Sequence, residues 1–471
     1  MKSFLFIFLF IVTVFTSTGQ DRMTLQEAVA MGIKNNLDVN QAGLQMQNAE
    51  IDYKQSKAFM LPDLNAFASH GINQGRSIDP FTNAYINQNV DYASYGASSS
   101  LLLFKGSSLQ NQIKQNKLGY EAAKLERQDA IDRITINIIL AYLQIVSAED
   151  VLKQVQEQVG VTGKQIERLE ILNNEGAITP TLLYDLKGQS ANEKISIADQ
   201  KAAIANAKLN LLQLLNIPYN KSFEVAGVSA ENISTEYPQS PEDIYTLALN
   251  NFARIKAAKM RTESAEKGIK AAKGALYPSL YLGGNLNTNY SSVASRSFFV
   301  NTAETASEDY VLVNGDKIPV IVQQSNFRND KINYGDQLNN NIFSSVNLTL
   351  NVPLFNASQT RNKIKKAKIT FENNQLIEQH TQTELQQAIE RAYVDVVNSF
   401  EKYQLLQNQV MAFTESFRAA EIRFNSGLIT SVDYLIAKNN LDRSNTNLII
   451  SRYDFVLRSK VLDYYQGKPL W

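Results

Sequence analysis

Residues 108–174 read SLQNQIKQNKLGYEAAKLERQDAIDRITINIILAYLQIVSAEDVLKQVQEQVGVTGKQIERLEILNN. No proline interrupts this polar run, and apolar or small residues return at every seventh position. A seven-residue repeat makes a helix pack along its neighbours in a left-handed coiled coil. At about 1.5 Å per residue the helix would be on the order of 100 Å long, far longer than an average globular helix. Taken alone, the pattern also fits a solvated coiled-coil stalk.

Two rows of apolar or small residues, offset by three positions, form the predicted helix seam. We expect both rows to face other helices and to be buried. The first row is Ile131, Ile138, Ile145, Leu152, Val159 and Ile166, and the second is Ile134, Ala141, Ala148, Val155, Thr162 and Leu169.

The pattern occurs twice in the chain. With 251 added to each number, Gly176 maps onto Gly427, and the strings Gly-Ala-Ile-Thr and Gly-Leu-Ile-Thr coincide. The sequence therefore predicts a tandem duplication. The first structural repeat covers residues 21–218, a linker covers 219–240, and the second repeat covers 241–471.

An offset of 216 relates the earlier parts of the two copies and maps Pro62 onto Pro278. Because the two offsets differ by 35, the second copy contains an insertion, which we place in the polar stretch 291–341. This stretch is predicted to be an extracellular loop if the chain spans a membrane, and disordered decoration if it does not.

The N-terminus has the features of a secretory signal peptide. Lys2 precedes an apolar run from Phe4 to Phe15, and the small residues before Gly19 fit a cleavage site. We therefore predict that residues 1–20 are removed on export. A transmembrane anchor is the alternative, but the run holds about a dozen residues and a spanning helix needs about 20.

Composition excludes several classes of protein. The chain has 46 basic and 46 acidic residues, whereas a nucleic-acid-binding protein shows a basic excess. It has no cysteine and two histidines, which argues against disulfides, a lipid anchor on an N-terminal cysteine and a transition-metal site. We expect no cofactor. No segment after the N-terminus has about 18 consecutive apolar residues, so no membrane helix is predicted there, and a membrane-spanning chain of this kind would use a closed barrel.

Each copy begins with helices that end at a proline. Thr24 and Glu27 have the spacing of a capping box, and a break in the helix is predicted at Asn35-Asn36. Pro62 and Pro278 then mark helix-to-strand junctions, since the residue before a proline disfavours the helical conformation.

After each proline the sequence period changes from helical to two, which predicts β-hairpins at about 63–104 and 279–355. The clearest alternation places Val346, Leu348 and Leu350 between polar residues. Strands of about 10 residues could span a membrane, with the apolar side facing lipid. The alternative is a soluble sheet with one face on a core. Four strands cannot close a wide barrel, so the membrane interpretation requires several chains.

A second helix returns from the end of each long helix, at 180–216 and at 431–466. Gly176 and Gly427 stand at the predicted tip turns, because a helix stop commonly needs a residue in the left-handed conformation.

The signal peptide, the duplicated unit, the prolines before the strands and the glycines at the tips together resemble the TolC-type outer-membrane efflux (outer-membrane factor) family. The resemblance covers essentially the whole mature chain. It implies a mainly α fold with membrane β-hairpins: a homotrimer forming a 12-stranded outer-membrane β-barrel that continues into a long periplasmic α-helical barrel.

The resemblance also implies a function. The trimer would be the outer-membrane exit duct of a tripartite efflux or type I secretion system, in contact with outer-membrane lipid. It would dock on a periplasmic adaptor (membrane fusion) protein and an inner-membrane pump of RND or ABC type. It would be a passive conduit and not an enzyme.

The family narrows its pore with acidic residues near the second tip. Asp433, six residues after Gly427, matches the first acidic position, whereas Ile436 stands at the second. Phe424 replaces the family's tip tyrosine, and Ile429 replaces its arginine. In the first copy the corresponding position is Leu182, with Asp185 three residues further on. Asp433, Asp185 and Phe424 are therefore the candidate aperture residues, and closure must use packing or polar pairs other than those of the family archetype.

One other class of function stays open at this level: a periplasmic coiled-coil adaptor or a structural protein. An adaptor would normally need a single helical hairpin and not two copies with membrane-type strands. An enzyme is disfavoured because no nucleophile–base arrangement or paired-carboxylate motif is present. The sequence does not distinguish drugs, metal ions and proteins as substrates.

Overall fold

The computed structural model describes residues 22–78, 83–227 and 237–468. The predicted signal peptide, residues 1–20, lies outside these ranges, and so does part of the predicted linker at 219–240.

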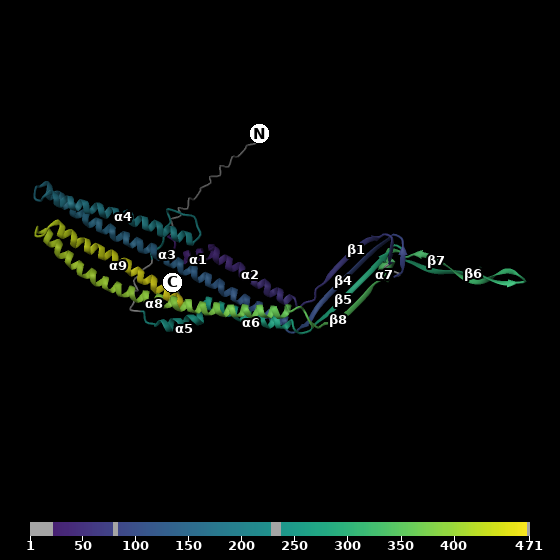
Figure 1. The fold of residues 1–471 in the computed structure, drawn as a ribbon. Helices are drawn as coiled ribbons and strands as arrows, with labels where there is room; N and C mark the ends of the chain where they lie inside the picture. The colour runs from purple at the N-terminus through teal and green to yellow at the C-terminus, as the bar shows by residue number, and fades with distance from the viewer. Residues whose placement is uncertain (1–21, 79–82, 228–236, 469–471) are drawn as a thin grey trace, which may run out of the picture. The chain divides into compact units, whose positions relative to one another are not determined.

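The described chain forms two compact units, one of helices and one mainly of strands (Figure 1). The helical unit contains residues 22–50, 117–264 and 371–468, and the strand unit contains residues 51–116 and 265–370. Each unit therefore takes segments from both predicted repeats. The division into repeats at 21–218 and 241–471 stays a prediction about the sequence.

The helices follow the order expected from the duplicated pattern. In chain order they are α1 (Leu25–Asn35), α2 (Leu37–Ala58), α3 (Ser108–Asn174), α4 (Pro180–Leu214), α5 (Pro241–Asn251), α6 (Ala253–Gly274), α7 (Tyr334–Asn340), α8 (Gln359–Asn425) and α9 (Ser431–Gln466).

A polar cap sets the start of α1. The Thr24 hydroxyl accepts a hydrogen bond from the Glu27 backbone N–H, and the Glu27 carboxylate accepts one from the Thr24 N–H at 2.8 Å. This reciprocal pair satisfies two N–H groups that the helix itself leaves free, and it confirms the predicted capping box. α1 ends at Asn35, and Asn36 has an extended backbone, as predicted.

The core of the helical unit is built on α3. Every residue of the two predicted apolar rows is buried or half-buried, so the prediction of a buried seam is confirmed. Ile138 and Tyr142 are fully buried, and the Tyr142 hydroxyl lies 2.6 Å from the carbonyl oxygen of Ala226. Among the described helices, α3 alone has a window long and apolar enough to cross a membrane, but 56% of that window is buried inside the structure. We therefore assign it to the core.

The strand unit contains a four-stranded antiparallel sheet. Its order is β1 (Asn65–Asn73), β4 (Val90–Lys105), β5 (Ser279–Ser291) and β8 (Phe343–Asn351). The central pairing of β4 with β5 joins the first copy to the second. A separate short ribbon pairs β2 (Arg76–Ile78) with β3 (Tyr85–Asn87).

The register places the predicted apolar rows on one face of the sheet. Leu101 on β4 lies opposite Leu282 on β5, and Leu282 lies opposite Leu348 on β8. On β8, Val346 is 80% exposed, and Leu348 and Leu350 are 63% exposed. Residues two apart in a strand share a face, so the single chain presents an apolar surface on this side of the sheet.

The insertion has regular secondary structure, so the alternative of disordered decoration is wrong, whereas its extracellular position stays a prediction. Residues 295–331 form a hairpin of β6 (Ser295–Val313) and β7 (Asp316–Lys331), and α7 follows it. The turn is at Asn314 and Gly315, whose φ angles of 57° and 94° suit a tight hairpin turn. The mostly polar composition of the stretch favoured disorder, but apolar strand residues flank the Asn314-Gly315 turn.

Candidate functional site

The tips of the two helical hairpins have the same turn. Gly176 has a φ of 71° and Gly427 a φ of 69°, both in the left-handed region where a side chain is disfavoured. After each glycine the next backbone N–H donates to a carbonyl of the preceding helix, from Ala177 to Leu172 and from Leu428 to Arg423, both at 2.8 Å. This pattern satisfies carbonyl groups at the end of α3 and of α8.

A small apolar cluster fills the space behind these turns. It consists of Leu169, Leu183, Leu186, Phe424 and Tyr434. The ring of Phe424 is stacked on that of Tyr434, with 4.6 Å between the ring centroids, and Phe424 is 8% exposed. The Phe424 ring is therefore packed between helices of this chain, and its role as an aperture residue stays a prediction.

Asp433 lies at the exposed start of α9, where it also caps the helix. Its carboxylate accepts hydrogen bonds from the Thr430 backbone N–H and hydroxyl, and the Asp433 N–H donates back to the Thr430 hydroxyl. These bonds to Thr430 lower the pKa of Asp433. The carboxylate is thus ionised and held at the tip, as an aperture charge requires, but its role in a pore stays a prediction.

Asp185, the other candidate acid, connects the two hairpins of the chain. Its carboxylate accepts a hydrogen bond of 2.7 Å from the hydroxyl of Ser431, which is buried at the start of α9. The residue is half-buried. Asp185 thus holds α4 against α9, which its position relative to Gly176 did not indicate.

A buried ionic cluster lies further along the same two helices. The Lys438 ammonium on α9 is 2.9 Å from Glu193 on α4 and also binds Asp442. The side chains of Lys438 and Glu193 are 3% and 6% exposed. Thr162 on α3 and Gln189 on α4 donate further hydrogen bonds to Glu193, at 2.9 and 3.1 Å. Burial raises the pKa of Asp442, because it removes water from the carboxylate.

We call the set of polar links between the two hairpins the polar seam. Each link joins a residue of the first copy to one of the second. They are Asp185–Ser431, Gln189–Asn439 at 2.8 Å, Glu193–Lys438, Arg168–Asn425 and Gln158 to the carbonyl of Asp442 at 3.2 Å. Sequence analysis missed them because apolar periodicity detects only the apolar side of a helix.

The two junction prolines lie where the sequence places them. Pro62 stands between α2 and β1, and Pro278 stands between α6 and β5. Among the residues that the structure describes, no group of three or more His, Cys, Asp or Glu side chains is arranged to hold a metal ion.

Comparison with known proteins agrees with this architecture. A sequence model of the family described as "Outer membrane efflux protein" matches residues 29–216 and 244–463, one match in each copy. Outer membrane protein TolC of Escherichia coli (strain K12) is 22% identical over 410 residues, which cover 86% of this chain and 74% of TolC. Outer membrane efflux protein BepC of Brucella suis is 20% identical over 459 residues, which cover 96% of this chain and 86% of BepC.

A solved structure shows the same fold. The crystal structure of the outer membrane protein VceC from Vibrio cholerae matches with a TM-score of 0.73 and 16% identity, over 95% of this chain and 97% of VceC.

Proposed function

This chain belongs to the outer membrane efflux protein family, and we propose that it is the passive exit duct through which an efflux system releases its substrates across the outer membrane. The observation that carries the proposal is that the family model matches both copies, including the helices that form the two hairpins. This replaces the alternative of a periplasmic adaptor or structural rod. The function needs no catalytic step.

The duct requires more than one copy of the chain. In the four-stranded sheet, β1 and β8 each pair on one side only, so the two outer edges are open among the described strands. Open edges are not tolerated in lipid, because their backbone groups lack partners. We propose a homotrimer in which β1 of one chain pairs with β8 of the next, which gives a 12-stranded barrel. The exposed apolar face of β8 supports this proposal, since it suits contact with lipid.

The hairpin tips are the proposed periplasmic entrance. Asp433 of each copy would contribute to a ring of negative charge, with Asp185 as a second contributor. The polar seam would hold the two hairpins of each chain together in the state described here. A periplasmic adaptor and an inner-membrane pump of RND or ABC type would deliver substrate to this end. Residues 1–20 would direct export and be cleaved.

A pair of lysine variants tests the membrane assignment. Leu348→Lys places a charge on the apolar face of β8, which costs about 2–4 kcal/mol near the middle of a bilayer. Asn347→Lys, the matched control, places the same charge one residue earlier on the opposite face. We expect Asn347→Lys to reach the outer membrane as a carbonate-resistant trimer and Leu348→Lys to assemble poorly. Equal assembly of the two variants, or a soluble periplasmic wild-type chain, would contradict the proposal.

A further inference from the structure

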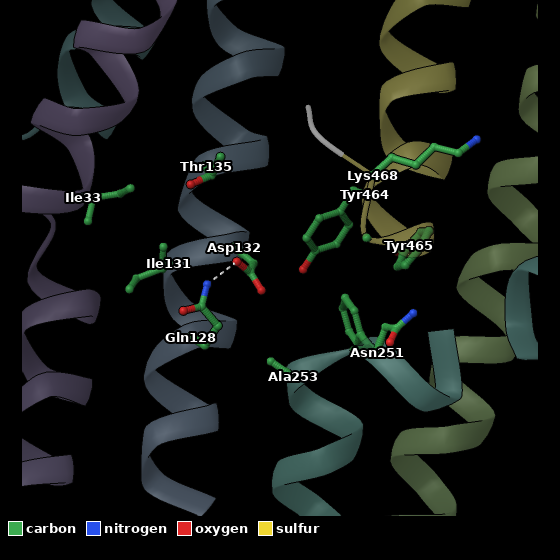
Figure 2. A pocket seen from close by; sticks show the side chains of 12 residues that line it. Ile33, Gln128, Ile131, Asp132, Thr135, Asn251, Ala253, Tyr464, Tyr465 and Lys468 are labelled. Atoms are coloured by element: carbon green, nitrogen blue, oxygen red, sulfur yellow. Dashed lines mark hydrogen bonds between the residues drawn. The ribbon is translucent and has the colours of Figure 1, made fainter. Parts of the chain in front are cut away.

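A cavity of about 450 Å³ lies within the helical unit, away from the hairpin tips. Residues of α1, α3, α5, α6 and α9 line it, together with Phe252 and the residues that follow α9 (Figure 2). Its volume falls within the range of sites that take small organic molecules, roughly 300–1,000 Å³. The proposed passive duct has no use for such a site.

Three aromatic rings form one wall of the cavity. Phe252 packs edge-on against Tyr464, with 5.3 Å between the ring centroids, and lies 5.9 Å from Tyr465. The centroids of Tyr464 and Tyr465 are 5.3 Å apart. Ile131 and Ile33 add aliphatic surface. Such a wall favours an apolar or aromatic ligand body, and ring faces also attract organic cations.

A carboxylate without a cation stands opposite this wall. Asp132 accepts a hydrogen bond of 2.7 Å from Gln128, a neutral side chain. Within residues 22–78, 83–227 and 237–468, no Lys, Arg or His forms an ion pair with it. The neighbouring Arg133 pairs with Asp129 at 3.2 Å, and Lys468, at the cavity rim, lies 3.8 Å from Asp463.

The Tyr464 hydroxyl is a second unused polar group. It is buried and has no hydrogen-bond partner among the described residues. Figure 2 shows it directed toward the Asp132 carboxylate across the cavity. Burial raises the pKa of both Asp132 and Tyr464, as expected for polar groups that lack a compensating charge. Asp132 is half-buried, and a ligand that brings a charged donor beside it would compensate its carboxylate.

We propose that this cavity binds an amphipathic organic cation, with its ammonium group between the Asp132 carboxylate and the Tyr464 hydroxyl and its apolar body against Phe252 and Tyr465. The ammonium donates to the carboxylate of Asp132 and to the hydroxyl oxygen of Tyr464. The site lies within the helical unit, and ligand binding there does not depend on the channel function.

The test uses the full chain in detergent and a fluorinated probe pair. The probe is 4-(trifluoromethyl)benzylamine, and 4-(trifluoromethyl)benzyl alcohol is its neutral counterpart and the control for partition into micelles. Binding is followed by fluorine NMR. We expect saturable binding of the amine, and binding of the alcohol about tenfold to a hundredfold weaker, since the charged hydrogen bond is lost. This comparison uses the wild-type chain and needs no variant to fold.

Two variants locate the site. Asp132→Asn keeps the shape of the side chain and removes its charge, so it should weaken amine binding by the same factor and leave alcohol binding unchanged. Asp199→Asn, at an exposed position of α4, removes an equal charge and should leave amine binding unchanged. Equal amine binding to the two variants, equal binding of amine and alcohol, or no saturable binding of the amine would each overturn the proposal.

Discussion

Lys438 tests whether the polar seam stabilises the hairpin tips through its charges. Lys438→Met keeps a chain of similar length but removes the ammonium, which leaves Glu193 and Asp442 without a cation. One oxygen of Glu193, Oε2, already lacks a partner among the described residues. The variant therefore places uncompensated negative charge in a nearly dry environment between α4 and α9.

The expected loss is large for a single substitution. Removing one partner of a buried ion pair costs about 3–5 kcal/mol. Because about 1.4 kcal/mol corresponds to a factor of ten, local opening of α4 and α9 should become roughly a hundredfold to a few thousandfold more frequent. Amide hydrogen exchange resolved by peptide measures this opening directly. Peptides near Glu193 and Lys438 should lose protection, whereas peptides of α1 should not.

Two further variants separate charge from packing. Lys194→Met changes an exposed lysine of α4 and should leave exchange unchanged. The triple variant Lys438→Met, Glu193→Gln, Asp442→Asn removes all three charges and should recover most of the protection, because replacing a whole buried ionic group is often nearly neutral. If Lys438→Met accelerates exchange by less than tenfold, or if the triple variant is as unprotected as the single one, the ionic account of the polar seam is refuted.

Three other outcomes are expected. Gly427→Ala should destabilise the chain by about 1–2 kcal/mol, because alanine disfavours a φ of 69°. Gly188→Ala, in the body of α4, should instead stabilise it by about 0.5–1 kcal/mol. Thermal unfolding compares the two variants, and equal shifts in melting temperature would contradict the turn assignment. Asp433→Asn should lower cation selectivity and weaken block by multivalent cations in single-channel recordings, because acidic rings favour cations; unchanged currents, also in combination with Asp185→Asn, would show that both are ordinary surface charges. Burial raises the pKa of Asp132. Protonated Asp132 therefore stabilises the fold below about pH 4, and this stabilisation is lost as the pH rises through the folded-state pKa. The melting temperature of Asp132→Asn should thus exceed that of the wild type at pH 7 but not at about pH 3, and a difference that does not change with pH would refute this.

The long helices were predictable because coiled-coil packing imposes a strict repeat. Ser108–Asn174 and its counterpart 251 residues later carry apolar rows that a solvated segment would not need. The duplication also supported the predicted junctions, because Pro62 and Pro278 occupy equivalent positions in the two copies. The strands of the sheet were predictable for a similar reason, because one face of each alternates regularly with the other.

The polar seam and the β6–β7 hairpin were not predicted, for two different physical reasons. Lys438 and Glu193 are 245 residues apart, and nothing in either local sequence indicates that their helices meet. The hairpin was overlooked because its apolar residues occur on both sides of a polar turn within a mostly polar stretch. The packing of the Phe424 ring was not predictable either, because equivalence with a family position carries no information about which way a ring packs.

The long helices α3 and α8 have 67 residues each, and the return helices α4 and α9 have 35 and 36. The helical hairpins of the two copies therefore have matched lengths. Deleting one heptad from α3 alone would shift α4 against α9 by about 10 Å, enough to separate the three links of the polar seam that join these two helices. The length of the helical hairpins can therefore change only if both hairpins gain or lose the same number of residues. A shorter or longer relative should accordingly differ by the same whole number of heptads in each half of its sequence.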